Sequence, residues 1–92
     1  MLTQKRTTNM RRIFEEILTL NLIPNGSPTF PLELTTEYSE DTDVLEMRLR
    51  WTGPEYNPLA QGDELTLKLG RAAVTDSRFT YEAGVNLLVV TL

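Results

Sequence analysis

The hydrophobic periodicity of the sequence changes at residues 24–28, which read Pro-Asn-Gly-Ser-Pro. Before this segment, over about residues 7–22, apolar side chains recur every three or four residues, as on one face of an α-helix. After it, over residues 30–38 and 44–51, they alternate with polar side chains, which is the period of half-buried strands. Because proline and glycine stop helices, we expect the helix to end at Pro24 and a β-hairpin to follow. The apolar face of this helix comprises Met10, Ile13, Phe14, Ile17 and Leu18.

The second half of the chain is predicted to contain another helix and another hairpin. Residues 52–62 include two prolines and two glycines and are expected to form an irregular loop. A helix is expected from Asp63, a suitable N-cap, to about Val74, and two strands follow at 78–82 and 86–92. This order predicts an α+β fold, a two-layer sandwich of a mostly antiparallel four-stranded sheet with two helices on one face. The last strand is nearly all apolar, so it is either buried on both faces or meets a partner.

Length and composition restrict the chemistry that the chain can perform. Its 92 residues predict one small domain, residues 1–92. The sequence has no cysteine and no histidine, which excludes thiol nucleophiles, disulfides, zinc sites of the Cys/His type and imidazole bases. The net charge of −4 argues against nucleic-acid binding. No apolar run is long enough to span a membrane, so we expect a cytoplasmic protein without membrane contact.

Charge is distributed unevenly along the chain. Residues 1–12 carry four basic side chains and no acidic one, and we expect them to be solvated. The loop of the first hairpin concentrates the acidic residues Glu40, Asp41 and Asp43. Such a group could bind a hard cation, but a solvated turn is the expected structure.

Four segments, in order, resemble the histidine kinase-like ATPase (GHKL) domain shared by histidine kinases, gyrase and Hsp90. The segments are Phe14–Thr19, Trp51–Pro58, Asp63–Leu69 and Phe79–Leu92. They are most similar to the family's Asn-bearing helix, its Asp-Asp-Gly-Pro-Pro-Phe-Asn-Pro box, its glycine-rich helix start and its closing hairpin, as found in bacterial anti-sigma-factor serine kinases. The resemblance implies a Bergerat-like fold that lacks the usual N-terminal strand and helix.

The resemblance assigns the catalytic glutamate of the family to Glu16. In family members an asparagine four residues later holds the magnesium ion, but that position here is Leu20, which has no oxygen to offer a hard cation. Asn21 is one residue away, which on an ideal helix turns its side chain by about 100° toward the apolar face. We therefore expect Asn21 to cap or end the helix, unless a register shift brings it into the metal site.

The other nucleotide positions of the family are also replaced. The aspartate that accepts a hydrogen bond from adenine corresponds to Trp51, which is expected to point inward and fill the pocket. Gly53 is retained. The two glycines that let backbone N–H groups approach the phosphates correspond to Glu64 and Thr66. Lys68 belongs to the same segment as a possible phosphate contact.

Three hypotheses follow from this pattern. The first is a degenerate kinase-like domain without a cofactor, which binds a regulatory protein such as a sigma factor or its antagonist. The second is an active serine kinase that uses ATP and magnesium, with Glu16 as base, Asn21 as metal ligand, and Lys68 or Arg71 at the phosphates. The third is an unrelated small α+β domain, such as a dimerisation module. Because the usual N-terminal cover is missing, we expect a homo-oligomer or a bound partner.

Overall fold

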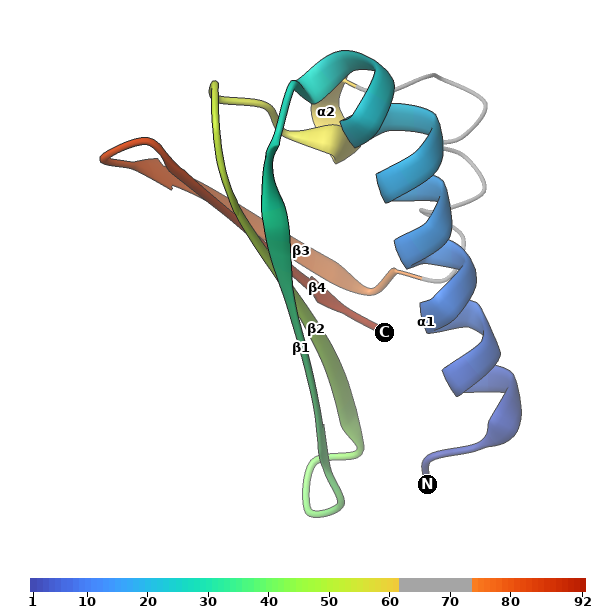
Figure 1. Cartoon of the computed structure of the whole chain (residues 1–92). Coiled ribbons are helices and arrows are strands. Elements are labelled where there is room, and N and C mark those ends of the chain that lie inside the picture. The colour runs from blue at the N-terminus through green and yellow to red at the C-terminus, as the bar shows by residue number, and fades with distance from the viewer. Residues whose placement is uncertain (62–73) are drawn as a thin grey trace.

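A computed structural model describes residues 1–61 and 74–92 of the chain (Figure 1). In chain order, its elements are α1 (Gln4–Glu16), the π-helix η1 (Ile17–Gly26), β1 (Thr29–Ser39), β2 (Val44–Thr52), α2 (Pro58–Gln61), β3 (Asp76–Glu82) and β4 (Val85–Thr91). Both hairpins that the sequence predicts are present. The helix expected from Asp63 onward lies outside the described residues.

The strands form one antiparallel sheet with the order β1-β2-β4-β3. The two hairpins lie side by side because β2 pairs with β4. The helices α1 and η1 cover one face of the sheet, α2 packs against η1, and no described element covers the other face (Figure 1). The shortest dimension of the fold, 19 Å, matches one helix layer on one sheet layer of about 10 Å each. The predicted α+β two-layer arrangement is therefore confirmed.

The strand β2 alternates as its sequence predicts. Its inward side chains are at most 3% exposed, and they are Leu45, Met47, Leu49 and Trp51. Its outward side chains include Arg48 and Arg50, which are exposed. Because the side-chain period of a strand is two residues, this burial pattern fixes the face on which every neighbouring strand must place its apolar residues.

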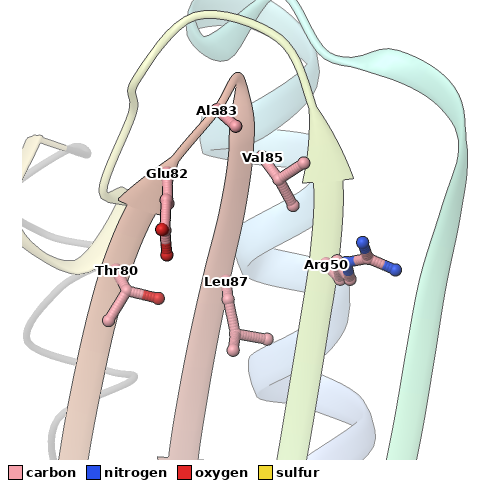
Figure 2. A pocket seen from close by; sticks show the side chains of 6 residues that line it. All are labelled: Arg50, Thr80, Glu82, Ala83, Val85 and Leu87. Carbon is pink, nitrogen blue, oxygen red and sulfur yellow. The ribbon is translucent and has the colours of Figure 1, made fainter.

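The strand β4 carries apolar side chains on both faces of the sheet. Asn86, Leu88 and Val90 point toward the helices and are fully buried. Val85, Leu87 and Val89 project from the opposite face, where Figure 2 shows the first two. Val89 is 8% exposed, whereas Val85 and Leu87 are half-buried. The sequence predicted that this strand is either buried on both faces or meets a partner. Its inward face is buried, whereas its outward face is buried only in part.

The hydrophobic core lies between the helices and the sheet. It is formed by Ile13, Ile17, Leu22, Met47, Leu49, Trp51, Tyr56, Leu88 and Val90. Ile13 and Ile17 belong to the helix face that the periodicity predicts, Leu22 lies further along in η1, and the strand members come from the inward positions of β2 and β4. Burial of each large apolar side chain stabilises the fold by about 1.5–3 kcal/mol.

The expectation that the helix ends at Pro24 is wrong. After Glu16 the helix widens into the π-helix η1, which continues through Pro24 to Gly26. Side chains compensate for the altered backbone bonding, because the Thr19 hydroxyl donates to the Glu15 carbonyl at 2.6 Å and the Asn21 amide donates to the Glu16 carbonyl at 3.1 Å. A widened turn of this kind accommodates a proline without a free helix end at that point.

The helical segment ends instead where it meets the loop after β2. A Cβ atom on Gly26 would lie 2.7 Å from the Leu22 side chain and 3.1 Å from the Tyr56 ring. Only glycine permits this close approach. The next residue, Ser27, adopts a left-handed conformation with φ of 48° and turns the chain toward β1. The end of the helix is thus set by tertiary packing.

One of the basic residues near the N-terminus joins distant parts of the fold. Arg6 donates to the Asp43 carboxylate at 2.7 Å and to the Leu92 carbonyl at 2.9 Å, and its guanidinium lies 5.6 Å from the centre of the Tyr38 ring. The expectation of a solvated basic segment is therefore wrong for Arg6. Its planar group with several donors bridges the first helix, the hairpin loop and the end of β4.

The acidic loop of the first hairpin is held by these contacts. The N-terminal amino group, the Tyr38 hydroxyl and Arg6 all donate to Asp43, and together they hold the pKa of its carboxyl well below the usual range. The hydrogen bond from Tyr38 to Asp43 also raises the pKa of the Tyr38 hydroxyl. Among the residues that the structure describes, no group of acidic side chains is arranged to hold a metal ion.

Candidate functional site

Four of the predicted site positions lie in the described part of the chain. Glu16 is the last residue of α1, Asn21 lies in η1, and Trp51 lies near the end of β2, followed by Gly53. The remaining predicted positions, Glu64, Thr66, Lys68 and Arg71, lie outside the described residues. The candidate site is therefore built here from the helix end, the end of β2 and the loop that follows it.

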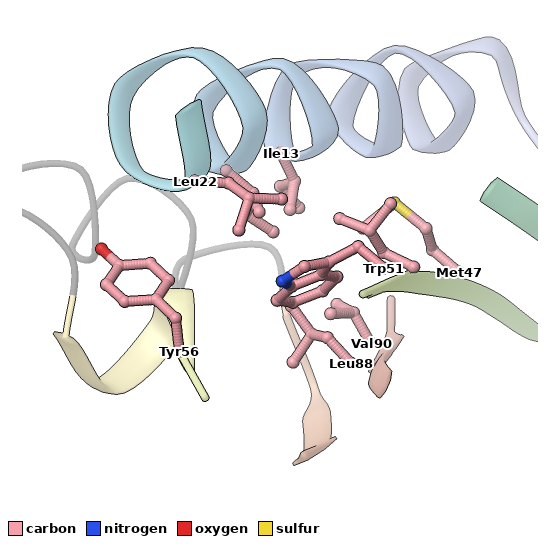
Figure 3. Close-up of a cluster of buried hydrophobic side chains, with 9 residues drawn as sticks. Ile13, Leu22, Met47, Trp51, Tyr56, Leu88 and Val90 are labelled. Carbon is pink, nitrogen blue, oxygen red and sulfur yellow. The ribbon is translucent and has the colours of Figure 1, made fainter. Parts of the chain in front are cut away.

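Trp51 lies between the helical layer and the sheet. Its side chain is 2% exposed and packs in the cluster that contains Ile13, Leu22 and Leu88 (Figure 3). Its ring centroid is 6.4 Å from that of Phe79 on β3, a separation at which aromatic rings interact. The predicted inward direction of Trp51 is confirmed, and the indole fills the space beneath the helix at this strand end.

Two polar atoms of the core lack a hydrogen-bond partner in the described part of the chain. The indole Nε1 of Trp51 and the hydroxyl of Tyr56 are both buried, and neither has a hydrogen-bond partner among residues 1–61 and 74–92. A buried donor without a partner costs about 1–3 kcal/mol relative to one that is satisfied. The packing of the large ring surface therefore has to offset this cost.

Asn21 points into the protein and is 1% exposed. Its amide donates to the backbone carbonyl of Glu16 at 3.1 Å. The expectation that Asn21 turns toward the apolar face is confirmed, but the expectation that it ends the helix is wrong because η1 continues to Gly26. In this position the side chain of Asn21 supports the widened helical turn.

A buried asparagine on β4 organises the loop after β2. The side-chain Oδ1 of Asn86 accepts from the Tyr56 backbone N–H at 3.0 Å, and its side-chain Nδ2 donates to the backbone carbonyls of Pro54 at 3.1 Å and Gly53 at 3.5 Å. The Tyr81 hydroxyl also donates to the Gly53 carbonyl, at 3.3 Å. The side chain of Asn86 therefore satisfies backbone groups of this loop.

Gly53 has a structural reason to be glycine. Its φ is +147°, and a Cβ atom there would lie 3.0 Å from the Ser27 carbonyl oxygen. Its N–H donates to the Gly84 carbonyl at 3.1 Å, which joins this loop to the turn between β3 and β4. Gly53 and Asn86 therefore hold the loop in place.

The sequence predicted an apolar last strand but did not identify the residues of the sheet face that no described element covers. The strand registers define three rows of outward side chains across β2, β4 and β3, which are Arg48–Val89–Arg78, Arg50–Leu87–Thr80 and Thr52–Val85–Glu82. The apolar residues at the outward positions of β4 indicated this face. The residues that lie beside them on β2 and β3 can be identified only when the strand order is known. We call these nine residues the outer patch.

Two of the four charged side chains of the outer patch, Arg48 and Arg50, form ion pairs within the chain. Arg48 donates to Glu46 at 2.5 Å, and this contact raises the pKa of the Arg48 guanidinium. Arg50 reaches toward β1 (Figure 2) and forms an ion pair with Glu33 at 3.3 Å. Exposed pairs of this type contribute about 0–1 kcal/mol to stability.

Comparisons with known proteins returned no match to a family model, to a curated protein or to a solved structure. Among the described residues, no helix is long and apolar enough to cross a membrane.

Proposed function

We propose that the chain is a degenerate histidine kinase-like domain that acts by protein contact and does not transfer phosphate. The observation that carries this proposal is the position of Trp51. Its 2% exposed indole occupies the helix–sheet interface, and the sequence resemblance aligns Trp51 with the aspartate that accepts from adenine. An indole is bulky and offers only a donor, so it can neither leave room for the base nor accept from its amino group.

The metal and phosphate positions support the same proposal. Asn21, the nearest substitute for the magnesium ligand, is buried and bonded to the helix backbone. At the sequence level, Leu20 has no oxygen ligand, and Glu64 would add a negative charge near a polyphosphate. The fold-building residues Gly53 and Asn86 remain. This combination favours a domain that keeps its scaffold and has lost its nucleotide site.

The resemblance suggests the class of partner. Anti-sigma-factor kinases bind sigma factors and antagonist proteins in the cytoplasm, and we propose a regulatory protein of this kind for this chain. The two-layer fold offers such a partner one sheet face that no described element covers (Figure 1). An isolated small domain with apolar side chains on such a face is expected to associate with itself or with another protein.

Isothermal titration calorimetry with ATP and Mg²⁺ tests the proposal. We expect no binding heat beyond dilution at nucleotide concentrations up to about 1 mM, which corresponds to a binding free energy weaker than about −4 kcal/mol. Saturable binding at micromolar affinity would overturn it. A parallel titration of Mg²⁺ alone identifies heat that arises from nonspecific contact with the acidic surface.

A further inference from the structure

We propose that the outer patch is the surface on which a second copy of this chain packs, face to face and with two-fold symmetry. The inference names one partner for the proposed role in protein contact and rests on that role. It starts from the apolar stripe of β4, formed by Val85, Leu87 and Val89, which projects away from α1. No described element covers this stripe (Figures 1 and 2).

The charges beside the stripe are arranged so that the patch complements itself. On β3, Arg78 lies opposite Val89, Thr80 lies opposite Leu87, and Glu82 lies opposite Val85. Consider a two-fold axis that lies between the two sheets, perpendicular to the strands, and passes over the middle row, which contains Leu87. This axis places the row of Val89 in one copy opposite the row of Val85 in the other. Arg78 of one copy then faces Glu82 of the other, and the reverse contact forms at the same time, as two-fold symmetry requires.

The same axis places apolar side chains against apolar side chains. Leu87 meets its symmetry copy, and Val85 meets Val89 of the second copy. Two antiparallel sheets that pack with nearly aligned strands, about 10 Å apart, bury such outward rows between them. The result is an apolar centre with a charged rim, which is the usual organisation of a protein interface.

Two open hollows in the surface agree with this axis. One has a volume of about 360 Å³ and is lined in part by Glu82 and Val85, and the other has a volume of about 240 Å³ and is lined in part by Arg78 and Val89. Both also involve Thr80 and Leu87. The proposed axis passes over the row of Thr80 and Leu87, which lines both hollows. The larger hollow of one copy therefore lies opposite the smaller hollow of the other copy.

The pairing state of the charges favours a contact between chains. Within residues 1–61 and 74–92, neither Arg78 nor Glu82 forms an ion pair, so both are available to a second copy. Arg50 would face its own symmetry copy, but Glu33 of the same chain already neutralises it. The charges of the patch are mixed in sign, which favours a self-complementary partner over a strongly acidic or strongly basic one.

The size of the patch predicts a reversible dimer. Nine outward side chains, each covering about 4.8 Å by 6.8 Å of the sheet, give an interface of about 600 Å² in total for the two copies, which is below the range of stable specific complexes and is expected of a weak, transient one. We therefore expect a dissociation constant in the micromolar range, about 10–100 µM.

Sedimentation equilibrium on the full chain and on charge-reversal variants tests this inference. The variants Arg78→Glu and Glu82→Arg each place like charges opposite one another twice per dimer, so each is expected to raise the dissociation constant at least about tenfold. An equimolar mixture of the two variants restores opposite charges at both contacts, and it is expected to regain dimer at nearly the native affinity. The double variant Arg78→Glu/Glu82→Arg is expected to dimerise as well.

The controls separate association from folding. The remote variant Glu40→Arg changes charge by the same amount in the exposed hairpin loop and is expected to leave the dissociation constant unchanged. Circular dichroism verifies that each variant is folded. A native chain that stays monomeric up to about 500 µM overturns the inference. So does a single variant that dimerises like the native chain, or a mixture that fails to regain dimer. None of these outcomes depends on nucleotide binding, which the calorimetric test measures separately.

Discussion

Replacement of Trp51 by alanine measures how strongly the fold depends on the ring that fills the helix–sheet interface. Trp51 is 2% exposed and lies in a cluster with apolar side chains from α1, η1, β2 and β4. Truncation of a buried aromatic side chain to alanine costs about 3–5 kcal/mol, because transfer free energy is lost and a cavity remains. The total stability of a small domain is about 5–15 kcal/mol, so this variant is expected to be marginally stable.

Urea denaturation followed by far-ultraviolet circular dichroism measures this loss, since the variant has no tryptophan to report by fluorescence. With a slope of about 1.5 kcal/mol/M, the midpoint is expected to fall by about 2–3 M. The matched control is Leu34→Ala, which removes an apolar side chain that is 44% exposed and is expected to cost less than about 1 kcal/mol. A cost below about 1 kcal/mol for Trp51→Ala would refute the reasoning, because a ring outside the core cannot occupy the pocket.

Three further variants test individual contacts of the fold. Asn86→Ala leaves the Tyr56 N–H and the Pro54 carbonyl without their partner, whereas the Gly53 carbonyl keeps its bond from the Tyr81 hydroxyl, and the variant should lower the free energy of unfolding by about 2–3 kcal/mol in thermal melts. Gly26→Ala forces contact with Leu22 and Tyr56 and should cost about 1–3 kcal/mol in urea titrations, whereas an unchanged midpoint would contradict the close approach. Asp43→Asn tests the depressed pKa of this carboxyl. Its stabilising contribution is present above the ordinary pKa of 3.8 and is lost as pH falls further, so the stability difference between native chain and variant should shrink below about pH 4.

The sequence was sufficient to predict the layers of the fold. Strict alternation in β2 identifies its buried face, including Trp51, and the Ala83-Gly84 pair marks the turn between β3 and β4. The end of the helix was predicted wrongly because local rules for Pro24 do not include the packing of Leu22 and Tyr56 around Gly26. That packing is a property of the tertiary structure.

Long-range contacts explain the remaining differences. The role of Arg6 depends on Asp43 and Leu92, which come close only when the sheet has formed. The outer patch depends on the pairing of β2 with β4, because that pairing places Arg48 and Arg50 beside the apolar stripe. Periodicity along one strand specifies its faces but does not identify its neighbours.

The central claim is that the indole of Trp51 occupies the place that a nucleotide would need. The intrinsic fluorescence of the native chain tests this claim most directly, because Trp51 is its only tryptophan. With Mg²⁺ present, addition of ATP up to about 1 mM is expected to leave the position of the emission maximum unchanged, since the buried ring contacts no ligand. A saturable shift of the emission, with a midpoint in the micromolar range, would contradict the claim.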